Sequence, residues 1–148
     1  MNRNTQDTSE RLNELLRGER SAVETYQQAF EKVGDDPRVD ELRAVVAEHR
    51  HAVQKLAEYV VAFGVEPSHD SGAWGTWART VMGTAKVFGD KASLVALKEG
   101  EEHGKKLYLD ALEDPRIDPI CRDMIQNDLL PKQIAHIETL ERILDTLN

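Results

Sequence analysis

The sequence contains an internal repeat, and this repeat restricts the possible folds more than any other feature. Two segments correspond at seven positions with a constant spacing of 82 residues. The pairs are Leu12 and Leu94, Leu15 and Leu97, Gly18 and Gly100, Glu19 and Glu101, Ala22 and Gly104, Tyr26 and Tyr108, and Ala29 and Ala111. Further along, Glu48 and His51 correspond to Gln133 and His136 at a spacing of 85 residues. Agreement at so many positions indicates that the second half of the chain is a diverged copy of a two-helix unit.

Both copies have the apolar periodicity of helices. Apolar residues recur at spacings of three and four, and the alternation typical of a strand is missing from the sequence. We expect an all-α chain with long helices over residues 8–32, 37–63, 90–112 and 118–147. A shorter helix is expected between the second and third, with apolar positions from Trp74 to Phe88. Residues 1–7 are expected to form a disordered tail and residues 8–148 a single domain.

The lengths of the links predict how the helices are connected. Short links containing glycine or proline join the first helix to the second and the third to the fourth, so each pair is expected to be antiparallel. The link between the second and third helices is much longer and carries the short extra helix. This connectivity is that of a ferritin-like antiparallel four-helix bundle with a long crossover.

Two glutamates lie where the interior of a bundle normally has apolar residues. Glu19 is in the middle of an apolar helix face that runs from Leu12 to Ala29, and Glu101 has the same place in the second copy. A carboxylate removed from water is costly unless charge or hydrogen bonds compensate it. We therefore expect either a cation bound between the helices or a buried network of acids, imidazoles, arginine and tyrosines.

Residues on the other two helices complete a pattern of metal ligands. Glu48 and His51 share one side of their helix, and Gln133 and His136 lie at the centre of an apolar face. One glutamate from each of two helices, with a Glu-x-x-His motif from each of the others, is the ligand set of di-iron carboxylate bundles. The predicted ligands are Glu19, Glu48, His51, Glu101, Gln133 and His136. Carboxylates and imidazoles suit iron or manganese, and the pattern predicts two ions per chain.

Five further residues bear on this prediction. Tyr26 and Tyr108 each lie two turns beyond a predicted glutamate ligand, so we expect them to donate hydrogen bonds to ligands across the bundle. His49 and His103 are weaker candidates, because His49 flanks the apolar face and His103 falls on a solvated one. Pro131, inside the fourth helix, predicts a kink or a local bulge.

At these residues the sequence resembles the ferritin-like superfamily. The segments Glu19-x2-Ala22-x3-Tyr26 and Glu48-His-Arg-His51-Ala52 are similar to the first two helices of rubrerythrin. The whole chain, over roughly residues 8–147, more closely resembles a bacterial ferritin-like four-helix-bundle family of unassigned function. The segments that carry this closer resemblance are residues 12–15, 72–74 and 99–108.

The sequence departs from the metal-binding families in three ways. Gln133 stands where those families have a glutamate, and Lys98 and Gly104 flank Glu101 where rubrerythrin has an additional acid. The single cysteine, Cys121, leaves no rubredoxin-type iron domain. The resemblance therefore implies the fold more specifically than it implies any one activity.

Charge and composition argue against other classes of function. A net charge of −8 disfavours binding to nucleic acid, and the longest apolar run, residues 59–63, is too short to cross a membrane. One cysteine excludes a disulfide framework, and the N-terminus lacks the apolar core of a signal peptide, so we expect a cytoplasmic protein. We also expect a homodimer. Trp74 and Trp77 are candidates for its interface, or alternatively cover the chain's own core.

Two functions fit these features. The first is a non-haem di-iron oxidoreductase or iron-handling protein that reacts with a small-molecule oxidant such as oxygen or peroxide. The second is a metal-free helical-bundle interaction or stress-response protein whose metal site has decayed. The sequence leaves both open.

Overall fold

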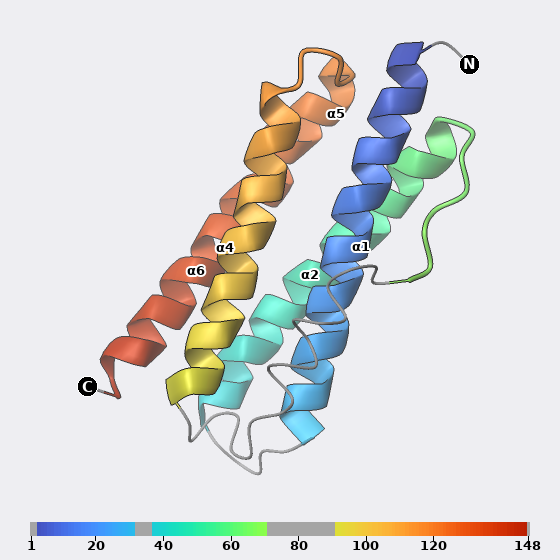
Figure 1. Ribbon diagram of the computed structural model, residues 1–148. Helices are drawn as coiled ribbons and strands as arrows, with labels where there is room; N and C mark the ends of the chain where they lie inside the picture. The colour runs from blue at the N-terminus through green and yellow to red at the C-terminus, as the bar shows by residue number, and fades with distance from the viewer. Residues whose placement is uncertain (1–2, 32–36, 71–90, 148) are drawn as a thin grey trace.

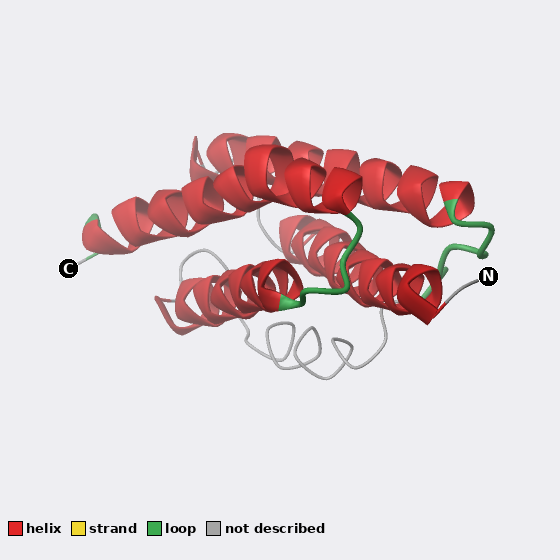
Figure 2. Cartoon of the chain, turned by 90° about the horizontal axis from the view of Figure 1, so that it is seen from above, coloured by secondary structure: helices red, strands yellow, loops and turns green. Residues whose placement is uncertain are grey.

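The computed structural model describes residues 3–31, 37–70 and 91–147, and its regular structure within these ranges is helical (Figures 1 and 2). The helices are α1 (Arg3–Glu31), α2 (Pro37–Ala62), α4 (Lys91–Glu113), α5 (Pro119–Met124), the π-helix η1 (Ile125–Leu129) and α6 (Leu130–Asp145). In Figure 1, α1 and α2 form one antiparallel hairpin, and α4 with α6 forms the other. The predicted all-α four-helix bundle is confirmed.

Two predicted segments need comment. The expected short helix with Trp74 and Trp77 lies outside the described residues. The expected N-terminal tail is wrong over its described part, because α1 begins at Arg3 and residues 3–7 are helical. This start is held from another part of the chain, since the Arg116 guanidinium lies 3.1 Å from the Asp7 carboxylate.

The fourth predicted helix is divided into three parts. Asp118 caps α5 by accepting a hydrogen bond from the Ile120 N–H at 2.8 Å. Beyond α5, the Leu130 N–H donates to the Ile125 carbonyl five residues back, as in a π-helix. The next residue, Pro131, has no N–H and cannot continue a regular ladder of hydrogen bonds. The bulge predicted from Pro131 is confirmed.

The core consists of two apolar clusters, one toward each end of the bundle. One cluster contains Leu12, Leu16, Leu56, Ile125 and Leu129 among its buried members. The other contains Leu42, Leu94, Leu97, Leu140 and Ile143 among its buried members. On each of the four long helices, a short polar stretch separates the two clusters along the chain. The bundle therefore encloses a polar layer between two apolar ones.

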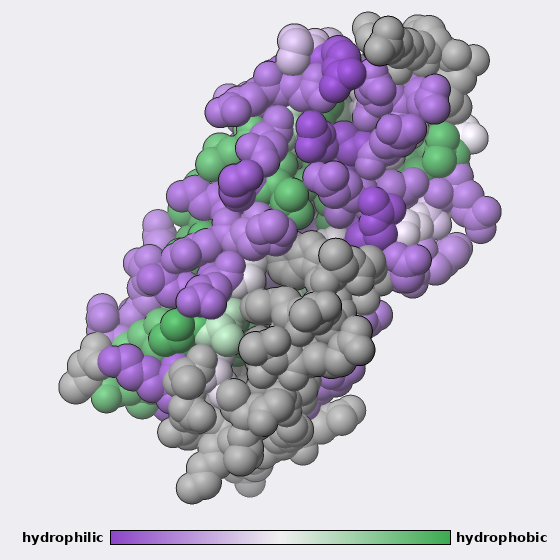
Figure 3. Space-filling view, viewed as in Figure 1, coloured by the Kyte–Doolittle hydropathy of each residue, from purple (hydrophilic) through white to green (hydrophobic). Residues whose placement is uncertain are grey.

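The outer surface is dominated by polar side chains. On the face drawn in Figure 3, the described surface is largely hydrophilic, and apolar residues show in bands between hydrophilic rows. None of the described helices is long and apolar enough to cross a lipid bilayer.

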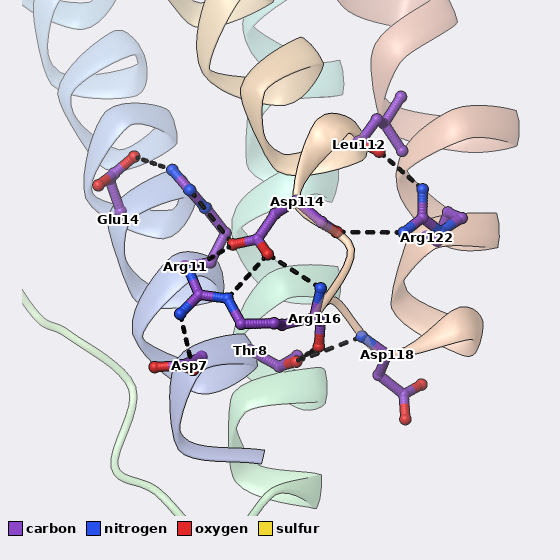
Figure 4. A network of polar contacts seen from close by, with 9 residues as sticks. All are labelled: Asp7, Thr8, Arg11, Glu14, Leu112, Asp114, Arg116, Asp118 and Arg122. Carbon is purple, nitrogen blue, oxygen red and sulfur yellow. Dashed lines mark hydrogen bonds and ion pairs between the residues drawn. The ribbon is translucent and has the colours of Figure 1, made fainter. Parts of the chain in front are cut away.

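A network of polar contacts fastens the turn between α4 and α5 (Figure 4). The Arg122 guanidinium donates to the carbonyls of Leu112 at 2.6 Å and Asp114 at 3.1 Å, which lie at the end of α4. The Thr8 hydroxyl donates to the Arg116 carbonyl at 3.3 Å, so the same turn is attached to α1. Charged donors thus satisfy carbonyls that the end of a helix leaves without partners.

Replacing Arg122 by alanine should lower the free energy of unfolding by about 1–2 kcal/mol, because two partly buried carbonyls lose a charged donor. The matched control is Arg142→Ala, which removes only an exposed ion pair to Glu41 and should cost less than about 0.5 kcal/mol. Urea unfolding measures both values. Equal losses in the two variants would contradict the role given to Arg122.

Candidate metal centre

Five buried polar side chains meet in the layer between the apolar clusters. All four long helices contribute, and each of the five residues is 5% exposed or less. The residues are Glu19 from α1, His49 from α2, Glu101 from α4, and Gln133 and His136 from α6. The helices thus place two acids and two imidazoles beyond the reach of bulk water.

His49 lies between the two acids and contacts both. Its Nδ1 is 2.5 Å from Oε2 of Glu19, and its Nε2 is 2.7 Å from Oε1 of Glu101. Because both carboxylates accept, an imidazole that satisfies both contacts must carry a proton on each nitrogen. His49 then acts as a cation between two anions that belong to different hairpins.

Each acid also accepts a hydrogen bond from a tyrosine of the opposite hairpin. Tyr26 on α1 donates to Oε1 of Glu101 at 2.9 Å, and Tyr108 on α4 donates to Oε1 of Glu19 at 2.5 Å. The hydrogen bonds across the bundle that the sequence predicts for both tyrosines are therefore present. They give the site an approximate two-fold symmetry that matches the internal repeat.

Burial and charge perturb the acidities of these groups. Burial lowers the pKa of His49, but the carboxylates of Glu101 and Glu19 outweigh it and hold that pKa well above its ordinary value. Burial raises the pKa of Glu101, yet His49 and His136 together bring it down to about 2. Burial, and then the charge of the adjacent glutamate, raises the pKa values of Tyr26 and Tyr108 well above the ordinary value. The favoured state is an ionised Glu101 beside a protonated His49, with both phenols neutral.

His136 is held on one side only. Its Nε2 lies 3.2 Å from Oε1 of Glu48, whose side chain is 40% exposed. Its Nδ1 is buried, lies 3.5 Å from Oε2 of Glu101 and makes no hydrogen bond with the described residues. The ring centroid of His136 is 4.6 Å from that of His49. A buried nitrogen that could accept or coordinate is thus directed at the most strongly bound acid of the site.

Gln133 supports Glu101 from α6. Its Nε2 donates to both the backbone carbonyl and Oε2 of Glu101, each at 2.7 Å. Gly104 makes this approach possible, because a Cβ at position 104 would lie 2.6 Å from that amide nitrogen. Gln133 therefore presents a donor to the acid at the position where the sequence comparison expects another acid.

The structure does not place His51 with the other predicted ligands. Its side chain is 43% exposed, and its Nε2 lies 3.1 Å from Oδ2 of Asp128 on the π-helix. His49, which we ranked below it, takes the interior position instead. The structure brings Glu19, Glu101, Gln133 and His136 together, and Glu48 reaches the group only at its edge, through His136. His103 is exposed.

The rotation of α2 explains this difference. Its buried residues Leu42, Val45, Ala52 and Leu56 are separated by three, seven and four positions, and His49 falls midway in the gap of seven. A helix turns about 100° per residue, so a side chain two positions later points to a different side. The apolar spacing of α2 was therefore the signal in the sequence that could have identified His49.

The same rotation changes the relation between the two copies. Three pairs of buried residues in α2 and α6 correspond at a spacing of 84 residues: His49 and Gln133, Ala52 and His136, and Leu56 and Leu140. The spacing of 85 inferred from matching residue types is thus one residue too long for this pair of helices.

Two features give the layer the character of a binding site. One atom from each of His49, Glu101 and His136 lies within 4.8 Å of the others, close enough for the three to share an ion. A cavity of about 20 Å³ adjoins two of these residues, and its lining includes Gly18, Gly100 and Gly104. About 10–15 Å³ is enough to hold one water molecule, so the cavity admits a small ligand.

Comparison with known proteins identifies the family. Residues 7–114 match a family described as a domain of unknown function, DUF2383. The chain belongs to this DUF2383 family. It is also similar to a solved structure of a ferritin-like, diiron-carboxylate protein from Bacillus anthracis str. Ames, with a TM-score of 0.75 and 20% sequence identity over 97% of this chain and 99% of the other. That likeness confirms the ferritin-like fold. None of the curated proteins matches the chain.

The pKa shifts predict how the stability of this DUF2383 protein depends on pH. A raised pKa of His49 contributes stability that is complete below about 6.5 and is lost as the pH rises through the folded-state pKa. The lowered pKa of Glu101 contributes stability that is lost as the pH falls from about 4.5 toward 2. The melting temperature should therefore be highest between these limits.

His49→Gln should remove most of the alkaline decrease, whereas the control His51→Gln, at an exposed position on the same helix, should retain it. Melting curves between pH 5 and 9 in the presence of a chelator test this. Parallel alkaline slopes in wild-type protein and His49→Gln would rule out His49 as the source.

Gly104→Ala should destabilise the protein although alanine is the better helix former. The added Cβ would displace the Gln133 amide, and we expect a loss of about 1–3 kcal/mol in the free energy of unfolding. In a Gln133→Ala background the clash is gone, so the same change should stabilise by up to about 1 kcal/mol. This reversal of sign is measured by a double-mutant cycle. A stabilising Gly104→Ala in the otherwise wild-type chain is the contrary result.

Proposed function

We propose that this protein binds a transition-metal ion, iron or manganese, in the polar layer at the centre of its bundle. The observation that carries the proposal is Nδ1 of His136, which is buried, has no hydrogen bond with the described residues and lies 3.5 Å from Oε2 of Glu101. A buried polar atom without a partner costs roughly 1–3 kcal/mol. An ion bound by this nitrogen and that carboxylate would remove the cost.

The chemistry of the donors favours these metals. Imidazole and carboxylate groups suit iron and manganese, whereas sites for softer metals use thiolates. Cys121 belongs to an apolar cluster at one end of the bundle, where burial raises its pKa to about 12. The similar solved structure is described as a diiron-carboxylate protein, which supports a carboxylate-bound metal here.

We propose oxygen- or peroxide-linked redox chemistry, or iron handling, as the role of the metal. A bound iron or manganese ion supplies one-electron redox and Lewis-acid chemistry. The protein contributes the surroundings: apolar clusters on both sides exclude water, and Tyr26 and Tyr108 hold the acids in place. The cavity of about 20 Å³ beside Glu19 and Glu101 is of a size for a small oxidant.

One observation favours a second candidate, a metal-free bundle that acts through interactions with other proteins. Glu19, His49 and Glu101 satisfy one another and the two tyrosines through hydrogen bonds. Such a layer is stable without an ion, as expected for a site that has lost its metal. The two candidates differ in whether added metal stabilises the folded chain.

Manganese or iron(II) should raise the melting temperature of the chelator-treated protein by roughly 5–10 °C at about 100 times the dissociation constant. His136→Ala and Glu101→Ala should abolish this shift, because each removes a proposed ligand. His51→Ala, which removes an exposed imidazole from the same helix as His49, is the matched control and should keep the full shift. An unchanged melting temperature of the wild-type protein with either metal supports the metal-free bundle instead.

A further inference from the structure

The two buried imidazoles have the same arrangement of neighbours. Each has a carboxylate at one ring nitrogen and faces Glu101 with the other. For His49 the outer carboxylate is Glu19, 2.5 Å from Nδ1, and Nε2 faces Glu101 at 2.7 Å. For His136 the outer carboxylate is Glu48, 3.2 Å from Nε2, and Nδ1 faces Glu101 at 3.5 Å. Glu101 is the common centre of both arrangements.

This arrangement is the one in which proteins present histidine to a metal. A ligating histidine nearly always donates its second ring N–H to a carboxylate, a carbonyl or water, which fixes the ring and the tautomer. Glu48 would accept from Nε2–H of His136 and leave the lone pair of Nδ1 directed inward. Glu19 would do the same for His49 through Nδ1–H.

We propose that the site holds one metal ion per chain, ligated by Nε2 of His49, a carboxylate oxygen of Glu101 and Nδ1 of His136. Glu19 and Glu48 are positioning residues that orient the two imidazoles and do not bind the ion. This inference rests on the proposed metal-binding function and narrows it, because the sequence pattern predicts two ions per chain.

Three observations leave a second ion without ligands. His51, which a second ion would need from α2, is exposed and lies beside Asp128. Gln133 directs its amide nitrogen, a donor, at Oε2 of Glu101. Among the described residues, His49, Glu101 and His136 form the group of three metal-ligating side chains whose donor atoms are close enough to share an ion.

The number of ions affects the chemistry available to the protein. Two histidines and one carboxylate are the ligands of mononuclear non-haem iron sites, which keep coordination positions open. The cavity of about 20 Å³ adjoins His49 and Glu101, two of the three ligands. A small molecule in the cavity would therefore lie next to the ion, so the inferred site takes one ion and one small ligand.

Titration of the chelator-treated full chain with manganese(II), followed by calorimetry and electron paramagnetic resonance, tests the inference. We expect one ion per chain with the six-line spectrum of an isolated manganese(II). His136→Ala should lose the ion. His51→Ala, the matched control on α2, should bind one ion with wild-type affinity.

Glu48 distinguishes a positioning residue from a ligand, and its partial exposure makes substitution tolerable. Glu48→Ala should still bind one ion, with about 10–100-fold weaker affinity. Glu48→Gln should recover part of that loss, because an amide oxygen still accepts from Nε2–H of His136 but cannot replace a bridging carboxylate.

Two ions per chain with an exchange-coupled spectrum, or loss of an ion in His51→Ala, would overturn the single-ion site and leave the proposed metal function intact. Complete loss of metal in Glu48→Gln would overturn the positioning role. Wild-type protein that retains no manganese would overturn both the inference and the proposed function.

Discussion

Two carboxylates in the dry centre of a helical bundle need positive charge between them, and the polar layer of this protein is built around that requirement. Glu19 and Glu101 come from different hairpins, and each lies within 2.7 Å of a nitrogen of His49. Without a cation, two like charges in a poorly polarisable interior repel strongly and lose their hydration as well. A single imidazole on α2 therefore links the acids of the two repeats.

The apolar clusters make this electrostatic arrangement effective. The polar layer lies between them on every long helix, so attraction between imidazole and carboxylate is weakly screened by water. Gly104 provides the close approach that Gln133 needs, which leaves Glu101 with donors from three helices: Tyr26 on α1, His49 on α2 and Gln133 on α6. Packing and charge thus hold one carboxylate in a nearly fixed position.

Much of this architecture could be predicted from the sequence because it follows from periodicity. The repeat and the three- and four-residue spacing of apolar side chains predicted four long helices, and the central place of Glu19 on its apolar face predicted a buried acid. The choice between His49 and His51 could not be made from the Glu-x-x-His motif. That motif favours His51, whereas the spacing of the buried residues of α2 places His49 inward, and only the packed helices decide.

The fourth helix shows a second limit of sequence reasoning. A π-helical turn accommodates one more residue than an α-helical turn, so distance along the chain no longer equals rotation around the axis. Pro131 predicted a bulge, but the five-residue π segment Ile125–Leu129 and its effect on facing could not be read from residue types. Nor did the sequence indicate that Glu48 reaches the site only through His136.

The asymmetry between the two repeats is the strongest reason to expect a single centre. In the spacing that matches burial, His49 corresponds to Gln133 and Ala52 to His136, so the two imidazoles lie one turn apart in their respective copies. An exact duplication would give each glutamate an imidazole of its own and create two equivalent half-sites. The shift by one turn instead directs both imidazoles at Glu101 and leaves Glu19 as the outer partner of His49. A bundle with symmetric helices has in this way acquired an asymmetric centre.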